Sequence, residues 1–377
     1  MSEQATVTVG FSDEQEELRK IVRRFLEERS PESEVRRLME TGAGYDPDVW
    51  RQMAGQLGLH GLAIPEQYGG SGYTFAEVFV VLEEMGRALL CAPFLSSVVM
   101  AAGLLLSSDD ETAKRDYLPG IADGSTLATV ALAEVSGRWD EQSITLAASA
   151  AGGGWTLSGE KCFVLDGQTA DVVFVAARTG AGVSVFAVDR GAQGLTTTAL
   201  STMDQTRKQA KLGFAAVQAR LIGTDGQGWA ALSRMLNLAV VGLAAEQVGG
   251  AQRVLDMAVD YAGLRVQFGR PIGSFQAIKH KCADMLLRVE SAKSAAYYAG
   301  SAAAAGGAEL PVAASLAKSY CSEAYFYAAA ENIQIHGGIG FTWEHPAHLY
   351  FKRAKTSQHL FGDPAYHRRL IAGQLGL

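Results

Sequence analysis

Residues 265–276 read RVQFGRPIGSFQ and residues 334–341 read QIHGGIGF, and these two stretches carry most of the information in the chain. The glycines of the second stretch remove side chains from a short run, so backbone N–H groups there can approach a diphosphate closely. Arg265 offers a charge-assisted donor to the same phosphates, and Gln276 offers a carboxamide to a sugar or phosphate oxygen. The alternative is that the glycines form ordinary turns and Arg265 is a surface charge.

Both stretches lie in a region, residues 229–377, that we expect to be helical. Apolar side chains recur there at helical spacing, and the short loops favour antiparallel neighbours, as in a four-helix bundle. Ile278, Cys282, Met285 and Val289 are predicted to share one helix face, and Val312, Leu316 and Tyr320 to share one face of the next helix.

The region before the bundle has a different pattern. In residues 124–228, short apolar runs alternate with glycine, serine, threonine and aspartate, which predicts an antiparallel β-barrel or sandwich. Residues 1–123 again favour helix: Ser12 and Gln15 form a capping box, and the glycine-rich run 58–72 predicts a loop. The sequence therefore predicts an α+β chain with an N-terminal helical domain, a middle β domain and a C-terminal helical bundle.

Composition narrows the function classes. The chain has 377 residues and a formal net charge of −7, which gives no electrostatic reason to expect nucleic-acid binding. Glycines and charges interrupt the apolar stretches, so we expect no membrane span. The cysteines and histidines form no metal-binding motif, so we expect no metal site. Widely spaced cysteines and the lack of a signal-peptide pattern predict a cytoplasmic protein.

Taken together, residues 64–70 (IPEQYGG), 265–276 and 334–341 resemble the acyl-CoA dehydrogenase family, and the similarity covers nearly the whole chain. The resemblance implies the same three-domain order, FAD as the cofactor, and oxidation of the Cα–Cβ bond of an acyl-CoA thioester. It also implies which residues hold the adenine and diphosphate half of FAD, often across a dimer interface. These residues are Arg265, Phe268, Gly269, Gln276, Gln334, Gly337 and Gly338, and Glu134 matches a cofactor-side position in the β domain.

Two β segments depart from the family. Residues 133–140 read AEVSGRWD where relatives have T-E-P-x-A-G-S-D, so only Glu134 is plainly kept. Residues 162–166 read CFVLD where relatives have the W-I-T-N strand that packs against the flavin ring. The lead-in LSGEK at residues 157–161 still matches. We therefore expect the β domain to be kept and the contacts to the flavin ring to differ.

The catalytic base departs further. Relatives carry a glutamate in a Y-E-G-T segment near the C-terminus, and here the resemblance places Phe361 at that position and Ala239 at a second known base position. Two carboxylates remain as candidates. Glu246 lies two helical turns beyond Ala239, on the same face, and a structural hydrogen bond or interface contact is its alternative role. Asp363 lies near Phe361, and capping of the following helix is its alternative role.

Three hypotheses follow from these departures. The chain is a working dehydrogenase with a relocated base, acting on a fatty or polycyclic acyl-CoA such as a steroid derivative. Alternatively, it is a subunit of a mixed oligomer in which an unlike chain supplies the base. The third hypothesis is a binding protein that keeps the fold without the chemistry. The first two imply a homo- or hetero-oligomer, a dimer or tetramer, and the resemblance implies an electron-transfer flavoprotein as electron acceptor.

Overall fold

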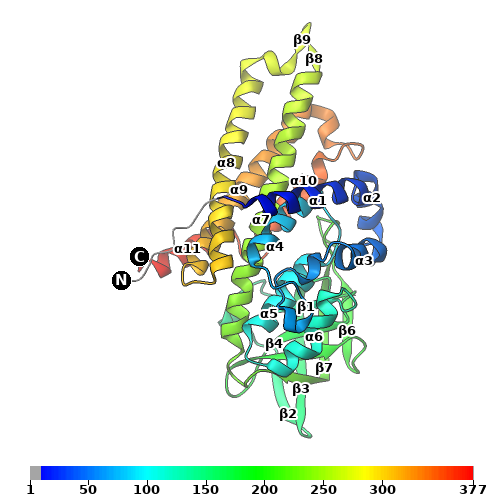
Figure 1. Cartoon of the computed structure of the whole chain (residues 1–377), viewed down its shortest axis with the longest axis vertical. Helices are drawn as coiled ribbons and strands as arrows, with labels where there is room; N and C mark the ends of the chain where they lie inside the picture. Colours follow the sequence, from blue (N-terminus) through cyan, green and yellow to red (C-terminus); the bar gives the residue numbers. More distant parts are fainter. Residues whose placement is uncertain (1–9, 377) are drawn as a thin grey trace. The chain divides into compact units, whose positions relative to one another are not determined.

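The computed structural model describes residues 10–376 and shows an α+β chain that forms two compact units (Figure 1). The first, which we call the helical unit, comprises the chain up to Val35, Phe75–Leu90 and everything from Val240 onward. The second, which we call the mixed unit, comprises Arg36–Thr74 and Cys91–Ala239. The predicted order of helical, β and helical segments is confirmed. The units group residues by contact, so the exact domain boundaries remain a prediction.

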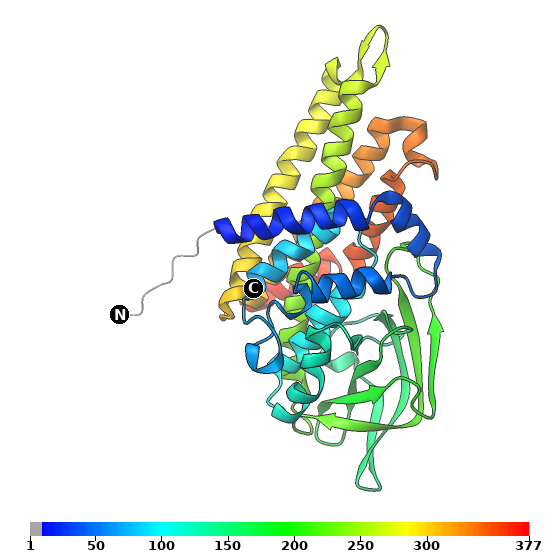
Figure 2. The same ribbon diagram turned by 45° about the vertical axis from the view of Figure 1, so that its right-hand side comes forward.

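The helical unit is built on long helices that connect through short turns. The C-terminal part of α7 and α8 run side by side in opposite directions and are joined by a small hairpin (Figures 1 and 2). Its elements are α1 (Asp13–Arg29), α4 (Phe75–Arg87), the later part of α7 (Gly228–Leu264), β8 (Val266–Gln267), β9 (Arg270–Pro271), η5 (Ile272–Ser274), α8 (Gln276–Ala305), α9 (Leu310–His336), η6 (Gly337–Phe341), α10 (Ala347–His359) and α11 (Pro364–Gln374).

Helix α1 begins as the sequence predicts. The hydroxyl of Ser12 accepts a hydrogen bond from the Gln15 N–H at 3.2 Å, and the Ser12 N–H donates to Oε1 of Gln15 at 3.0 Å. This reciprocal pair satisfies two backbone donors that an uncapped helix would leave open. The capping box is therefore confirmed.

The apolar face that the sequence suggests for α9 is not its buried face. Leu316 and Tyr320 are 43% and 39% exposed. The buried face is lined mostly by small side chains, and Cys321 Sγ lies 3.4 Å from the carbonyl oxygen of Ala292 on α8. Small side chains let two helices approach closely, so the alanine face of α9 packs inward although larger apolar residues lie on the other side. In α8, Met285 and Val289 are buried, whereas Ile278 and Cys282 are half-buried.

The mixed unit combines helices with the β-structure. Its helical elements are α3 (Pro47–Gly55), η1 (Leu59–Gly61), η2 (Glu66–Tyr68), η3 (Leu95–Ala101), α5 (Ala102–Ser107), α6 (Glu111–Ala122) and η4 (Glu141–Ser143). Its strands are β1 (Ala128–Ala131), β2 (Ala147–Ala151), β3 (Gly154–Leu165), β4 (Val172–Arg178), β5 (Val183–Asp189), β6 (Leu195–Ala199) and β7 (Gln209–Ile222). Helix α2 (Glu32–Glu40) and helix α7 each run from one unit into the other.

The sheet follows the order β1-β4-β2-β3-β7-β5, and β4 also pairs with β5, so the sheet closes on itself. Its core is lined by side chains such as Leu157, Phe186 and Leu212, which are fully buried. Most of its neighbouring strands pair antiparallel as predicted, but β1 pairs with β4 in parallel, from Ala128 opposite Val172 onward. Parallel neighbours cannot be joined by a tight turn, and here β2 and β3 form the long connection between them.

Helix α7 bears on the expectation that the chain has no membrane span. By length and composition alone it could cross a bilayer, since an 18-residue window has a mean hydropathy of 1.3. Of that window, 61% is buried inside the protein, which is the environment of a core helix.

Candidate functional site

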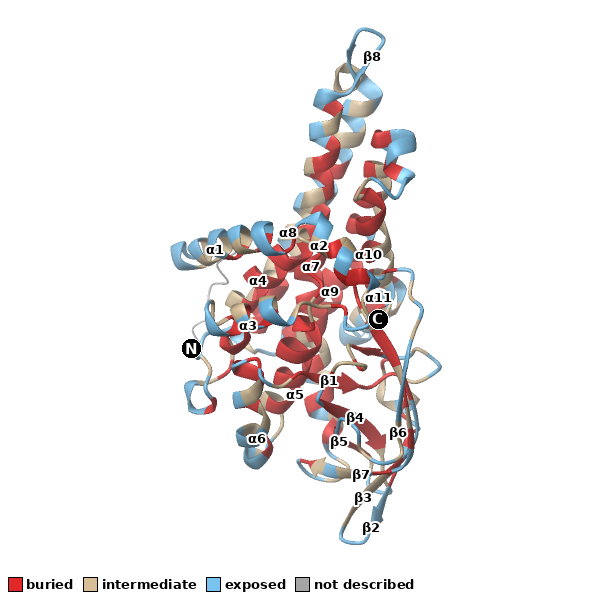
Figure 3. Cartoon of the chain, turned by 90° about the vertical axis from the view of Figure 1, so that its right-hand side faces the viewer, coloured by how far each residue is buried: buried red, intermediate tan, exposed pale blue. Residues whose placement is uncertain are grey.

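The Arg265 motif lies at the far end of the α7–α8 pair, in the exposed hairpin shown in Figure 3. The turn residues Phe268 and Gly269 have φ angles of 52° and 77°, and two successive positive values are typical of a tight hairpin turn. The Phe268 ring is 92% exposed. Arg265 precedes the hairpin, and its backbone N–H donates to the carbonyl of Tyr261 at 2.8 Å. The motif therefore presents its side chains to the surroundings rather than to its own core.

The glycine motif lies at the end of α9 and contacts the end of α7. Gly337 ends the helix with φ 65° and ψ −142°, a conformation that side chains with a Cβ disfavour. A Cβ added at Gly337 or Gly338 would meet no atom within 4 Å, so both glycines border open space. The ring of the preceding His336 stacks on Tyr261 with centroids 4.2 Å apart. Because Tyr261 lies one turn before Arg265, this contact brings the two motifs together.

The chemistry of these residues fits the diphosphate half of FAD. Arg265, Gln276 and Gln334 are all exposed, and they offer guanidinium and carboxamide donors. Within residues 10–376, no carboxylate lies within ion-pair distance of Arg265, so its charge is available to a phosphate. The exposure of the whole set means that one chain covers such a ligand from one side only.

Glu134 anchors a loop of the mixed unit. Its Oε1 accepts hydrogen bonds from the N–H groups of Thr145 and Leu146 at 2.8 and 2.9 Å and from Nζ of Lys161 at 2.8 Å. Burial alone would raise the pKa of the Glu134 carboxyl, but Lys161 and Thr145 hold it below its usual range. Burial lowers the pKa of Lys161 to about 8. Glu134 also lines an open groove together with Val135 and Arg138, so its role toward FAD stays a prediction.

Phe163 is a candidate that the sequence reading did not single out. It lies in a bulge where the β3–β7 register shifts between Lys161 and Val164, with φ 58° and 38% of its surface exposed. A Cβ added at Gly137, in the loop that Glu134 anchors, would lie 3.7 Å from its ring. The sequence feature that could have pointed to Phe163 is its aromatic side chain in the segment that matches the family's W-I-T-N strand. Phe163 is thus a partly exposed aromatic side chain in the segment that the resemblance places against the flavin ring.

Ala239 and Phe361, which the resemblance assigns to the two base positions of the family, are buried and carry no ionisable group. Ala239 is 0% exposed and Phe361 is 1% exposed. Phe361 has φ 61°, which is uncommon for an aromatic residue and persists only where the surroundings enforce it.

A clamp that the sequence reading missed holds the Phe361 segment. Lys318 Nζ donates to the carbonyls of Gln358 and Gly362 at 3.0 and 2.9 Å and to the Ser322 hydroxyl at 3.1 Å. His367 Nε2 lies 3.0 Å from the carbonyl oxygen of Phe361. We call Lys318 and His367 the clamp. Each is buried, and no periodic pattern in the sequence distinguishes them from surface residues.

Burial sets the protonation of the clamp. It lowers the pKa of Lys318 to about 7 and, together with the nearby Lys318, that of His367 to about 4. His367 is therefore neutral at pH 7 and can donate from Nε2 to the Phe361 carbonyl. The Ser322 hydroxyl that accepts from Lys318 also accepts a hydrogen bond from Nε2 of Gln247 on α7, at 3.0 Å. The loop after α10 is thus tied to the core of the helical unit.

Both candidate carboxylates have structural partners. Glu246 is 8% exposed, and its Oε2 lies 3.8 Å from Nη1 of Arg353. Asp363 caps α11, since its Oδ1 accepts from the Tyr366 N–H at 2.7 Å. The cap is the alternative role that the sequence left open for Asp363, and the contact of Glu246 is an ion pair within the chain. A catalytic role for either one stays a prediction.

Three family models cover almost the whole chain. The N-terminal, middle and C-terminal domain models of acyl-CoA dehydrogenase match residues 12–125, 129–217 and 226–376.

Individual relatives agree with these matches. The acyl-CoA dehydrogenase IpdE2 of Mycolicibacterium smegmatis is 36% identical, over 97% of this chain and 100% of its own length. Among solved structures, the ChsE4-ChsE5 complex of Mycobacterium tuberculosis has a chain with a TM-score of 0.89 and 28% identity, covering 98% of each chain. The Tcur3481-Tcur3483 steroid ACAD has a TM-score of 0.88 and 32% identity, covering 98% of this chain and 99% of that one. The chain therefore belongs to the acyl-CoA dehydrogenase family, whose members are FAD-dependent oxidoreductases acting on acyl-CoA.

Proposed function

We propose that this chain is the base-less subunit of a two-chain acyl-CoA dehydrogenase. In this proposal it contributes donors to the adenine and diphosphate half of FAD, and a related partner chain contributes the carboxylate that removes the α-proton. The observation that carries the proposal is the pair of buried, non-ionisable side chains, Ala239 and Phe361, at the two positions where relatives keep that carboxylate.

The remaining acidic candidates support the same reading. An α-proton base must lie within hydrogen-bonding reach of its substrate carbon and must be free to take a proton. Glu246 lies in an ion pair with Arg353, and Asp363 is occupied by the N-terminus of α11. Both carboxylates therefore serve the helical unit in this proposal.

In this proposal the chain keeps hydrogen-bond donors for FAD, which we call the donor set: Arg265, Gln276 and Gln334. Bound FAD would supply the acceptor for the hydride that leaves the β-carbon. On this chain, Arg265 would neutralise phosphate charge, while Gln276 and Gln334 would orient phosphate or sugar oxygens. Gly337 and Gly338 leave room for a close backbone approach. Because these groups are exposed, a second chain must cover the other side of the cofactor.

The substrate and partners follow from the relatives with the same architecture. Two of the solved structures are described as the ChsE4-ChsE5 complex and as the Tcur3481-Tcur3483 steroid ACAD. We therefore propose an acyl-CoA thioester with a bulky, ring-containing acyl group as the substrate. An electron-transfer flavoprotein is the proposed acceptor, and one solved relative is described as such a flavoprotein.

The first experiment is the visible absorption spectrum of the chain purified alone and after co-purification with a second, related family chain. The proposal expects little flavin in the chain alone, and about one flavin per shared site with the partner. Acyl-CoA oxidation should appear only in the mixture. A yellow chain that oxidises acyl-CoA unaided would overturn the proposal.

The variant Glu246→Gln separates this proposal from a relocated base. If the partner supplies the base, turnover of the assembled enzyme should stay within about threefold of the wild type. Loss of a true base would lower kcat by roughly 10²–10⁴-fold while FAD stays bound. Flavin content and the unfolding midpoint of the variant provide the controls for indirect effects.

A further inference from the structure

A separate cavity lies inside the helical unit, away from the exposed hairpin. It has a volume of about 260 Å³ and is lined by residues of α1, the start of α2, the end of α4, the middle of α7 and the start of α10. Guanidinium groups from three helices converge on it: Arg23, Arg87 and Arg253. No residue of this cavity belongs to the donor set described above or to the clamp.

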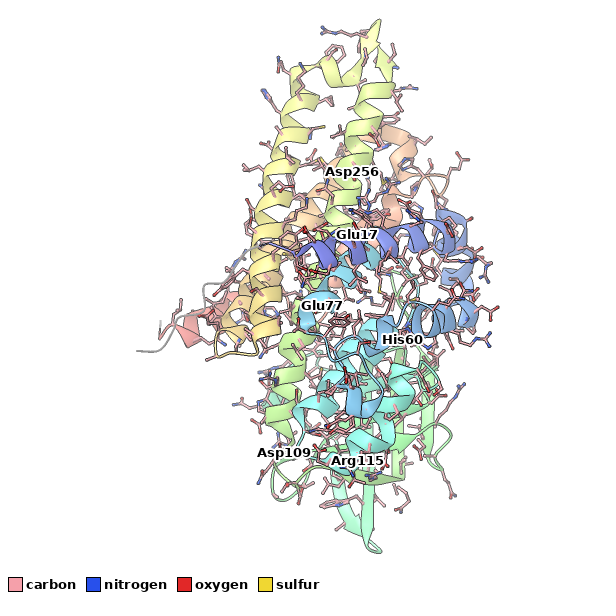
Figure 4. The ribbon with its side chains drawn as sticks, viewed as in Figure 1. Glu17, His60, Glu77, Asp109, Arg115 and Asp256 are labelled. Atoms are coloured by element: carbon pink, nitrogen blue, oxygen red, sulfur yellow. The ribbon has the colours of Figure 1, made fainter. Side chains whose placement is uncertain are left out.

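Two of these arginines are already neutralised. Arg23 binds Glu84 through two parallel hydrogen bonds, Nε to Oε2 at 2.8 Å and Nη2 to Oε1 at 2.7 Å. Arg87 Nη1 lies 2.8 Å from Oδ2 of Asp256, which is labelled in Figure 4. Both carboxylates are therefore occupied, and neither leaves a net charge for a ligand.

Arg253 differs from the other two. It is half-buried, and within the part of the chain that the structure describes no carboxylate lies within ion-pair distance of it. Its interaction partner is the hydroxyl of Tyr350, whose proton is donated to the carbonyl of Arg87 at 2.8 Å. A half-buried guanidinium without a counter-charge is costly, and an anion in the cavity would relieve that cost.

The rest of the lining defines the anion. The walls include Leu26, Val35, Met257 and Leu349, all of which are buried and apolar. Such walls favour a ligand with a hydrocarbon body, because its burial contributes free energy in proportion to its apolar area. Room of this size suits a small molecule and not a nucleotide.

Two acidic residues of the lining limit the ligand's charge. Glu27 and Glu32 both line the cavity and are exposed. Two carboxylates in the lining repel a doubly charged phosphate more than a singly charged carboxylate. One unneutralised arginine inside also matches one negative charge.

We propose that this cavity binds a small organic acid, with its carboxylate on Arg253 and Tyr350 and its apolar body against Met257 and Leu349. Neither the family comparisons nor the proposed function assigns a ligand to this place. The proposal therefore stands whether or not the chain needs a partner for catalysis.

The test is calorimetric titration of the full chain with butyrate, benzoate and inorganic phosphate as separate probes. We expect at least one of the two carboxylates to bind, and Arg253→Gln to weaken that binding at least tenfold. Arg24→Gln, an exposed arginine on α1, is the matched control and should bind as the wild type does. Met257→Trp should block the acid by filling the cavity without changing its charge.

Three results would overturn the proposal. These are no binding of either carboxylate to the wild type, equal binding to Arg253→Gln, and binding of phosphate in place of the carboxylates. Circular dichroism and the unfolding midpoint of each variant show whether the fold is intact. If Arg253→Gln fails to fold, Met257→Trp still decides, since unchanged carboxylate binding in that variant would overturn the assignment.

Discussion

The exposed end of the helical unit and the loop after α10 treat polar groups in opposite ways. At the exposed end, Arg265, Gln276 and Gln334 point donors away from the chain's own core. At the loop after α10, Lys318 of α9 and His367 of α11 direct their polar atoms to backbone carbonyls of the same chain. The polar groups of the first region are available to a ligand, and those of the second bind the chain's own backbone. Substitutions that remove the loop's hydrogen bonds should therefore lower the free energy of unfolding, whereas substitutions at the exposed end should lower the affinity for a ligand.

The largest effect is expected where α4 crosses α7 in the helical unit. A Cβ at Gly86 would lie 2.1 Å from the carbonyl oxygen of Glu246, so Gly86→Ala must push two helices apart. We expect a loss of at least about 3 kcal/mol in the free energy of unfolding, measured by urea denaturation. Gly373→Ala, in α11 with no atom near the added Cβ, should instead stabilise by about 0.5 kcal/mol. Equal results for the two variants would contradict the close crossing.

The next effect tests the clamp. Lys318→Met keeps the length of the side chain but leaves the carbonyls of Gln358 and Gly362 without their donor. Relief of the buried amine offsets part of that loss, and we expect a net destabilisation of about 2 kcal/mol. Lys279→Met, an exposed position on α8, should change the unfolding free energy by less than about 0.5 kcal/mol. A neutral Lys318→Met variant would show that the loop holds its path without the clamp.

The pH dependence of His367 sharpens the same comparison. Its pKa is about 4 in the folded protein and 6.5 for the unperturbed side chain. Between these two pH values the unfolded chain therefore binds a proton that the folded chain does not. Stability from this residue is present above pH 6.5 and is lost as the pH falls toward 4. At pH 5 we expect the wild type to lose about 1–2 kcal/mol more, relative to pH 7, than His367→Gln does. Parallel curves for the two proteins would contradict a neutral, buried His367.

The smallest change in free energy is expected at the exposed end. Arg265→Gln should weaken FAD binding by the assembled protein roughly tenfold, because one charge-assisted contact to a phosphate is lost. The unfolding free energy of the chain without FAD should stay within about 0.5 kcal/mol of the wild type, since Arg265 is exposed. Flavin fluorescence titration and urea denaturation measure the two quantities. A large loss of stability would mean that the exposed end also holds the chain together.

Local sequence patterns predicted the elements whose causes are local. The capping box at Ser12 and Gln15 involves residues three apart, and the turn at Gly337 follows from a backbone conformation that glycine tolerates. Such a pattern does not decide burial in α9, where the face that carries Leu316 and Tyr320 is exposed. Helical spacing identifies candidate faces, but the neighbouring helix decides which of them is buried.

The candidate site also contains residues that local motifs indicate and residues whose roles depend on distant segments. Its donor set could be identified from the sequence because Arg265, Gln276 and the glycines belong to short motifs. The contacts of Lys318, His367 and Arg253 could not, because each of them depends on residues far away along the chain. Lys318, for example, meets Gly362 across 44 positions.

By itself the sequence predicted the α+β order and the family, both of which are confirmed, and it predicts the loss of the usual base, because residue types and their spacing carry these properties directly. Only the tertiary structure decided which groups the remaining carboxylates contact. It placed Arg353 opposite Glu246 and the start of α11 opposite Asp363. Within the described residues 10–376, it also placed no carboxylate within ion-pair distance of Arg253, which lines a cavity. The physical reason is that a side chain's charge partner is set by packing between distant segments, and no local pattern encodes that distance.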